Sequence, residues 1–168
     1  GLEHTDIATN ERGAIVVNDT CESSVPGVYA VGDVNGGPQF TYISLDDFRI
    51  VFGALTGNSQ YTLKDRKNIP YTTFLTPPLS RVGLTEEDAI NQGYMVKTKE
   101  MLVATMPRAH VNDYLKGAFK IVVDADNDLI LGATLYAQGA EELINLIKIA
   151  MDNNIPYTYF KNQIFTHP

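Results

Sequence analysis

The sequence has little cysteine, because Cys21 is the only one among its 168 residues. A single cysteine excludes an intrachain disulfide and a zinc site built from four cysteines. It also fits a reducing compartment, so we expect a cytoplasmic protein. No apolar run approaches the roughly 20 residues that span a bilayer. The opening segment "GLEHTDIATNERG" has neither the basic nor the apolar region of a signal peptide. We therefore expect no membrane partner.

The sequence is also short of positive charge. It contains 13 lysines and arginines against 20 aspartates and glutamates, which gives a formal net charge of −7. The basic residues form no cluster, and a phosphate backbone would be repelled, so we expect no nucleic-acid partner. With 44% hydrophobic and 20% charged residues, the composition is that of a folded globular protein.

Several motifs that would identify a site are missing from the sequence. It contains no Gly-x-Gly-x-x-Gly and no Gly-x-x-x-x-Gly-Lys loop for phosphate groups. The histidines His4, His110 and His167 are far apart along the chain, which predicts no metal site. The segment "DADNDLILGATL" begins like a calcium loop, but Leu129 and Leu135 stand where that loop needs glycine and glutamate. We expect a hairpin turn there and no metal ion.

The first sixty residues predict part of an α/β layer. Residues 14–17, "AIVV", are a strand candidate. The apolar run 28–31 leads directly into Gly32-Asp33, which is typical of a buried parallel strand whose carboxyl end faces a ligand crevice. The apolar spacing over 42–57 predicts a helix that ends at a glycine. So few elements cannot complete a sheet, so we expect the rest of this layer to lie outside the chain.

The remainder of the chain predicts an α+β layer, with an antiparallel sheet and helices on one side. A charged linker, residues 59–68, separates it from the first part. Thr85 and Asp88 stand at the two positions of a helix capping box. The expected elements are a proline-broken strand at 70–78, a helix at 84–93, strands at 95–104, 118–123 and 129–136, and helices at 140–154 and 157–163.

The helix expected at 140–154 is apolar over more than one face. Six apolar side chains form one stripe, and Leu146 and Ile149 fall beside that stripe and widen it. A helix of this kind is buried on more than one side. Two explanations remain open, a subunit interface and a helix sunk in the core of its own domain. The stripe consists of Ala140, Leu143, Ile144, Ile147, Ala150 and Met151.

Four segments in register resemble the C-terminal third of the pyridine nucleotide-disulfide oxidoreductases, the FAD family of dihydrolipoamide dehydrogenase, glutathione reductase and mercuric reductase. They are "TCESSVPGVYAVGDV", "YTTFLTPPLSRVGLTEEDA", "LKGAFKIVVDADNDLILGATLYAQGAEELI" and "FTHP". The segments "QFTYISLDDFRIV" and "NIPYTTFLTPPLSRVGLTEE" are most similar to a bacterial subgroup linked to resistance to reactive chlorine species. The resemblance implies a fragment of an α/β FAD-binding domain over 1–60. Residues 61–168 would be an α+β dimerisation domain that is truncated after its His-Pro motif.

The resemblance also implies a cofactor site. Gly32 and Asp33 match the family's Gly-Asp pair, whose aspartate binds the ribityl chain of FAD. An acceptor-only carboxylate suits a polyol. Phe40 and Thr41 match the segment whose amides face the pyrimidine edge of the flavin, where a helix dipole favours the anionic reduced form.

His167 matches the catalytic histidine of the family's His-Pro motif. In a homodimer formed through residues 68–168, the resemblance implies that this histidine reaches the redox site of the other subunit. There it would exchange a proton with a substrate thiol. The implied enzyme passes electrons from NAD(P)H through FAD and a redox-active disulfide to a small-molecule disulfide or oxidant. Cys21 is single and lies outside the family's redox motif, so we expect it to play no part.

Several parts of that enzyme are not in the sequence. The FAD-phosphate loop, the cysteine pair and the NAD(P)H domain are expected before Gly1, and a glutamate is expected after Pro168. We therefore expect the 168-residue chain to be inactive, to dimerise and to bind no cofactor by itself. The alternative is a non-enzymatic dimerisation module with a vestigial FAD-binding segment. Disulfides, lipoamide, Hg(II), Cu(II) and chlorine-derived oxidants all remain open as substrates.

Overall fold

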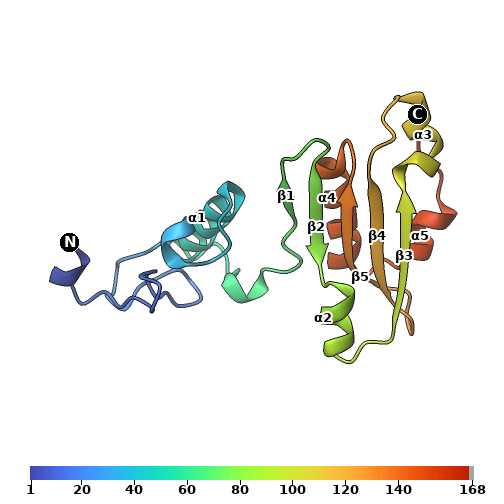
Figure 1. The fold of residues 1–168 in the computed structure, drawn as a ribbon. Coiled ribbons are helices and arrows are strands. Elements are labelled where there is room, and N and C mark those ends of the chain that lie inside the picture. Colours follow the sequence, from blue (N-terminus) through green and yellow to red (C-terminus); the bar gives the residue numbers. More distant parts are fainter. Residues whose placement is uncertain (167–168) are drawn as a thin grey trace. The chain divides into compact units, whose positions relative to one another are not determined.

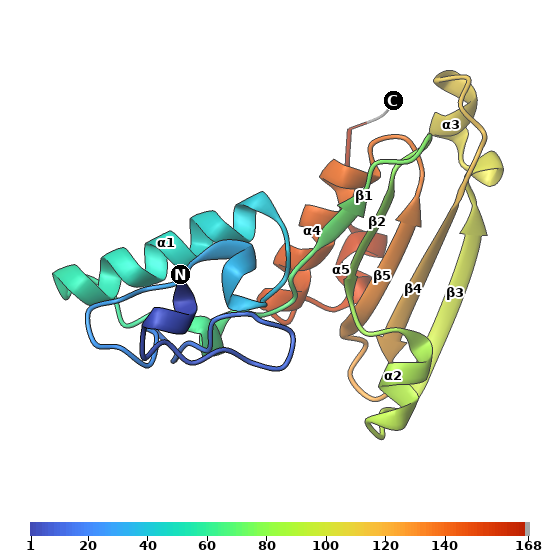
Figure 2. The same cartoon turned by 60° about the vertical axis from the view of Figure 1, so that its left-hand side comes forward.

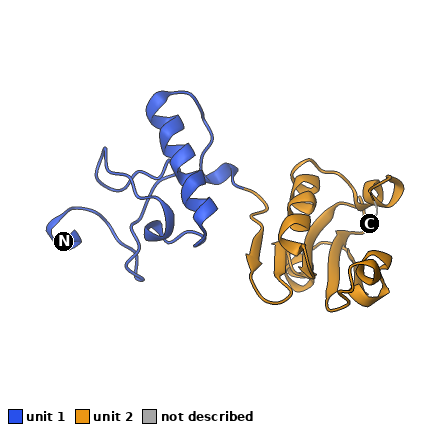
Figure 3. Ribbon diagram, turned by 90° about the horizontal axis from the view of Figure 1, so that it is seen from above, with its two compact units in different colours: residues 1–66 blue, residues 67–168 orange. Residues whose placement is uncertain are grey.

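The computed structural model describes residues 1–166, and the chain divides into two compact units, Gly1–Arg66 and Lys67–Pro168 (Figure 3). Each unit is considered by itself. Within the described residues, no helix has both the length and the apolar character needed to cross a membrane.

The main element of the first unit is the helix α1, Thr41–Thr56 (Figure 1). It buries Ile43, Asp47, Ile50 and Gly53 on one side, a spacing that follows the helical repeat. Gly57 follows it with φ of 69°, a left-handed conformation that glycine adopts without steric cost. The prediction of a helix over 42–57 is confirmed. Two short 3₁₀ turns, Leu2–His4 and Gly32–Asn35, complete the regular structure of this unit before residue 60.

The strands expected at 14–17 and 28–31 were wrong. The described part of the first unit contains only isolated antiparallel bridges there, such as Val17 with Ser23 and Glu22 with Tyr29. The run 28–31 is not a buried parallel strand, because Val28 and Val31 remain 38% and 41% exposed. An apolar run becomes a sheet strand only when a neighbouring strand satisfies its backbone groups. In this unit, neighbouring segments pair with these runs only through isolated bridges.

The second unit contains a five-stranded antiparallel sheet with the order β1-β2-β5-β4-β3 (Figure 1). The predicted α+β architecture is confirmed, as are the three strands expected at 95–104, 118–123 and 129–136. The short strand β2 was not predicted, and the strand expected at 70–78 shrinks to three residues. The strands are β1 (Tyr71–Thr73), β2 (Leu79–Gly83), β3 (Val96–Leu102), β4 (Ala118–Asp124) and β5 (Ile130–Tyr136).

Two helices, α4 and α5, lie on the same face of this sheet (Figures 1 and 2). Their predicted positions are confirmed, whereas the short helix α3 was not predicted. Proline at the first position of α3 fits a helix start, because its missing N–H has no intrahelical partner there. The helices are α2 (Glu86–Asn91), α3 (Pro107–Val111), α4 (Ala140–Asp152) and α5 (Tyr157–Asn162).

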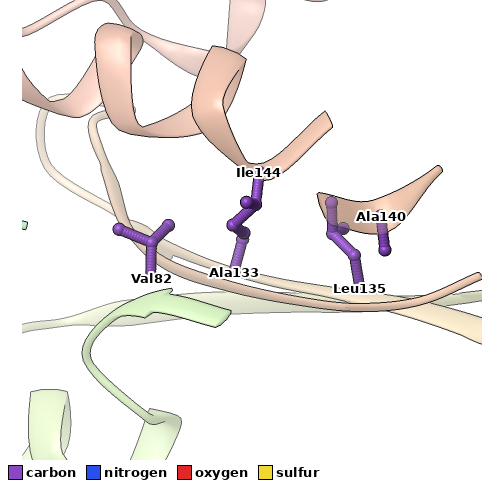
Figure 4. Packing of buried hydrophobic residues seen from close by; sticks show 5 residues of the cluster. All are labelled: Val82, Ala133, Leu135, Ala140 and Ile144. Atoms are coloured by element: carbon purple, nitrogen blue, oxygen red, sulfur yellow. The ribbon is translucent and has the colours of Figure 1, made fainter. Parts of the chain in front are cut away.

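The core of the second unit lies between α4 and the centre of the sheet. Val82, Ala133 and Leu135 point from β2 and β5 toward Ala140 and Ile144 of α4 (Figure 4). All five side chains are buried, with at most 5% of their surface exposed. The burial of these apolar groups stabilises the sheet and helix together, at roughly 25 cal/mol for each Å² removed from water.

The other side of α4 stays apolar and open. Leu143, Leu146 and Ile149 are 39%, 50% and 55% exposed. The helix is therefore buried in the core of its own unit, as one of the two explanations had it, and the subunit interface stays a prediction. One face packs into the core of its own unit, and the face beside it remains available to a further surface.

The capping box of α2 is present as predicted, and it supports a first test. The Thr85 hydroxyl oxygen accepts a hydrogen bond from the Asp88 amide at 3.0 Å, and the Asp88 carboxylate accepts one from the Thr85 amide at 3.3 Å. We expect Thr85→Ala to lower the free energy of unfolding of the second unit by about 1 kcal/mol. Urea denaturation would measure the loss, and Thr85→Ser, which keeps the hydroxyl, should retain most of the stability.

Candidate functional site

The predicted Gly32-Asp33 pair begins the 3₁₀ turn Gly32–Asn35. Gly32 is buried with φ of 73°, and a Cβ at this position would lie 3.0 Å from the Cβ of Ser44 in the first turn of α1. The turn therefore needs glycine for its backbone conformation and for its close approach to the helix. The Asp33 side chain is exposed. A carboxylate at this position can accept hydrogen bonds from a ligand.

Phe40 and Thr41 form the start of α1. Phe40 is the N-cap residue in extended conformation, and its carbonyl oxygen accepts the hydrogen bond of the Ile43 amide at 2.9 Å. The start of a helix carries a partial positive charge from its aligned peptide dipoles. Because Gly32 touches Ser44, the structure brings the four predicted cofactor residues to one end of this helix.

A hollow of about 460 Å³ opens beside Asp33. Its wall also includes Asn10, Arg12 and Gln39, and it is lined by polar and apolar groups alike. Asn10 is fixed locally, because its Oδ1 accepts hydrogen bonds from the amides of Arg12 and Ala14 at 2.9 and 3.1 Å. None of these lining residues was identified from the sequence, which holds no short motif that marks them.

Beneath the turn lies a buried carboxylate that sequence reasoning missed. Asp47 of α1 is fully buried, and its Oδ2 accepts hydrogen bonds from the Gly32 amide at 2.8 Å and from Asn35 Nδ2 at 3.0 Å. Its Oδ1 accepts a third bond from Nη2 of Arg66 at 2.5 Å. The signal was the position of Asp47 on the apolar stripe of the helix, between Ile43 and Ile50, where a charge requires a buried partner.

Arg66 connects this carboxylate to a second one. Its side chain is only 10% exposed, and its Nε donates to Asp46 Oδ2 at 2.8 Å. Burial tends to lower the pKa of Arg66, but the hydrogen bond and the negative charge of Asp47 outweigh it and hold that pKa above its ordinary value. The guanidinium is therefore a permanent cation at the base of the turn.

Cys21 lies near the same buried charges. Its side chain is fully buried, and burial followed by the charge of Asp47 raises the pKa of the thiol to about 11. A thiol acts as a nucleophile only in its thiolate form. These surroundings suppress the chemistry that a redox cysteine would need.

We expect Cys21 to resist alkylation in the folded chain. At pH 8 a pKa of about 11 leaves on the order of 0.1% of the thiol as thiolate, and the sulfur is also shielded from solvent. Iodoacetamide at that pH should therefore label the chain only after denaturation, as mass spectrometry would show. Rapid labelling of the native chain, with no loss of folded signal, would contradict the burial of this residue.

His167, the remaining predicted site residue, lies outside the described residues. Among the described residues, no group of three or more His, Cys, Asp or Glu side chains could hold a metal ion. Asp124 closes the expected hairpin turn, since its carboxylate accepts hydrogen bonds from the Asp126 amide and from Asn127 Nδ2 at 3.0 and 2.8 Å. The prediction of a hairpin turn there is confirmed.

Two family models match the chain. The model of the pyridine nucleotide-disulphide oxidoreductase dimerisation domain covers residues 69–168, and a second pyridine nucleotide-disulphide oxidoreductase model covers residues 1–47. Together they account for parts of both compact units.

Individual relatives agree with the family models. The probable pyridine nucleotide-disulfide oxidoreductase RclA of Escherichia coli is 48% identical over 99% of this chain and 38% of its own length. A dihydrolipoyl dehydrogenase of Chlorobaculum tepidum is 33% identical over 100% and 35%, respectively. A mercuric reductase of Staphylococcus aureus is 33% identical over 89% and 27%. The chain therefore spans less than two fifths of the length of these curated relatives.

Solved structures show the same likeness. The HOCl-induced flavoprotein disulfide reductase RclA of Escherichia coli superposes with a TM-score of 0.94 at 47% identity, over 99% of this chain and 38% of that one. LpdA of Mycobacterium tuberculosis, at 22% identity and a TM-score of 0.87, shows the fold alone. Because a single family model covers residues 69–168, more than half of the chain, the protein belongs to the pyridine nucleotide-disulphide oxidoreductase family.

Proposed function

We propose that the chain is the C-terminal part of an FAD-dependent reductase that passes electrons from NAD(P)H through a redox disulfide to a small-molecule disulfide or oxidant. Residues 1–60 would belong to its FAD-binding domain and residues 61–168 to its dimerisation domain. One observation carries the proposal. The glycine-aspartate turn at Gly32 and the start of α1 lie against each other, with a hollow beside the aspartate.

The residues at this turn suit the flavin. Gly32 lets the turn that carries Asp33 pack closely on the start of α1, because a Cβ there would lie 3.0 Å from the Cβ of Ser44. The exposed carboxylate of Asp33 can accept hydrogen bonds from the hydroxyl groups of the ribityl chain. The partial positive charge at Phe40 and Thr41 would stabilise negative charge on the flavin ring. The flavin, when bound, supplies the hydride-accepting chemistry.

His167 is proposed as the acid–base residue of the thiol exchange. A histidine near neutral pH can take a proton from a substrate thiol and return it to a leaving thiolate. Its partners, the redox cysteines, are not in this sequence, and Cys21 is unsuited to replace them. We propose that the 168-residue chain is inactive by itself for this reason.

The flavin site is tested by Asp33→Ala in the full-length protein that contains this chain. Loss of a hydrogen bond to a charged group costs about 1.5–3 kcal/mol, so FAD should bind about 10- to 100-fold more weakly. Fluorescence titration of the apoprotein with FAD measures this. Asp6→Ala removes another exposed carboxylate of the first unit and should leave the affinity unchanged. Equal affinities for wild type and Asp33→Ala would remove Asp33 from the site.

Homodimerisation through residues 68–168 is the second part of the proposal. The open apolar face of α4 supports it, since burying a face of this kind in a subunit interface is favourable. Ile149→Glu should turn the dimer into a monomer in sizing chromatography with light scattering. Ile90→Glu is the matched control, because Ile90 of α2 is also 55% exposed. Dissociation by Ile90→Glu but not by Ile149→Glu would place the interface elsewhere.

A further inference from the structure

We propose that Asp47, paired with Arg66, is a positioning residue for the flavin site. It holds both ends of the turn that carries Asp33. This inference rests on the proposed function, because Asp33 is the group that would touch the cofactor. Asp47 itself is fully buried, so it acts through the turn and not on a ligand.

Asp47 binds both ends of the 3₁₀ turn. A single carboxylate oxygen, Oδ2 of Asp47, accepts hydrogen bonds from the Gly32 amide and from Asn35 Nδ2, the first and last residues of the 3₁₀ turn. Asn35 also donates to the Ala30 carbonyl at 3.2 Å and accepts from the Gly37 amide at 3.0 Å. The backbone before and after Asp33 is therefore fastened to one point on α1.

The buried position of Asp47 could also hold an apolar side chain. An apolar residue at this position would continue the stripe of Ile43 and Ile50 and would fill the core without a charge. Replacing a buried ion pair by apolar groups is often neutral or stabilising, so such a pair is weak evidence for a role in stability. A carboxylate offers what an apolar group cannot, namely directional acceptors for two donors of the turn.

Arg66 fixes the orientation of the Asp47 carboxylate. Its Nη2 occupies the other oxygen, Oδ1 of Asp47, which leaves Oδ2 for the turn. Its Nε is held by Asp46, whose Oδ2 also accepts a weaker bond from the Tyr61 hydroxyl at 3.4 Å. The guanidinium is thus fixed from two sides, and it fixes the orientation of the carboxylate that holds the turn.

The test compares three variants of the full-length protein. Asp47→Asn keeps the size of the side chain but replaces one acceptor by a donor, so the network can no longer satisfy both Gly32 and Arg66. Asn35→Leu removes one donor of the turn and leaves the Asp47–Arg66 pair in place. Asp6→Asn is the control, because it makes the same charge change at an exposed residue of the first unit.

Two readouts separate positioning from folding. The FAD dissociation constant should rise about 10-fold or more in Asp47→Asn and Asn35→Leu, and by less than about 3-fold in Asp6→Asn. Amide hydrogen exchange at Gly32 should accelerate in Asp47→Asn, while the amide of Ile50 in the same helix stays protected. Faster exchange at both amides with unchanged FAD affinity would overturn the proposal.

A double-mutant cycle with Asp33→Ala completes the test. If Asp47 acts through Asp33, the double variant Asp33→Ala, Asp47→Asn binds FAD no more weakly than Asp33→Ala alone. Additive losses would overturn the positioning role. An effect of Asp33→Ala without one of Asp47→Asn rejects only this inference, whereas no effect of Asp33→Ala removes Asp33 from the proposed cofactor site and rejects this inference with it.

Discussion

Replacing Arg66 with methionine is expected to lower the free energy of unfolding of the first unit by about 3 kcal/mol. The substitution keeps much of the side-chain length but leaves the fully buried Asp47 without its cation. Removing one partner of a buried pair costs roughly 3–5 kcal/mol. We expect the lower end, because Gly32 and Asn35 still donate hydrogen bonds to the carboxylate.

Native-state hydrogen exchange of α1 measures this loss directly, since it reports the opening of the first unit separately from the second. Lys64→Met is the matched control. Lys64 also forms an ion pair, with Asp19, but its side chain is 77% exposed, and exposed pairs of this kind contribute little. If both variants lose the same stability, the burial of the Arg66 network is not what matters.

Gly132→Ala is expected to damage the sheet strongly, with a loss of about 3 kcal/mol or more. Gly132 of β5 lies opposite Gly83 of β2, and a Cβ on it would stand 2.0 Å from the Leu84 carbonyl oxygen. The obstacle is backbone directly after β2, so side chains cannot rearrange to relieve it. The two strands would have to separate at the centre of the sheet.

Gly93→Ala isolates this effect from ordinary glycine strain. Gly93 has φ of 87° and no heavy atom within 4 Å of an added Cβ, so the substitution introduces only the cost of a left-handed alanine, about 1–2 kcal/mol. Thermal unfolding of both variants gives the comparison. A milder effect of Gly132→Ala than of Gly93→Ala would show that β2 and β5 can move apart at little cost.

The sequence predicted those elements whose signals are local. The helices at 41–56 and 140–152 have apolar spacing and clear ends, and Thr85 with Asp88 marks the start of α2 within four residues of sequence. Strand β2 was missed because its five residues follow two prolines and alternate without a strong apolar pattern. Its existence depends on β5, which is far along the chain.

The candidate site shows the same division. Gly32, Asp33, Phe40 and Thr41 could be identified because they lie in segments that resemble a known family. Asp47 and Arg66 could not be paired from the sequence, because Arg66 stands in a stretch that resembles a solvated, charged linker. A charged residue on an apolar helix stripe indicates that it has a buried partner, but only the folded chain shows which residue that partner is.

The order of the sheet, β1-β2-β5-β4-β3, has a consequence for how the domain forms. β4 and β5 are neighbours in sequence and can pair as a hairpin, whereas β2 must wait for β5, which follows it after α2, β3, α3 and β4. Pairing that closes so long a loop is slow. We therefore expect Val82→Ala to accelerate unfolding and Val122→Ala to slow folding in stopped-flow experiments; the reverse would refute this order. During synthesis on a ribosome, β1 and β2 would be made first but would be the last strands to join the sheet.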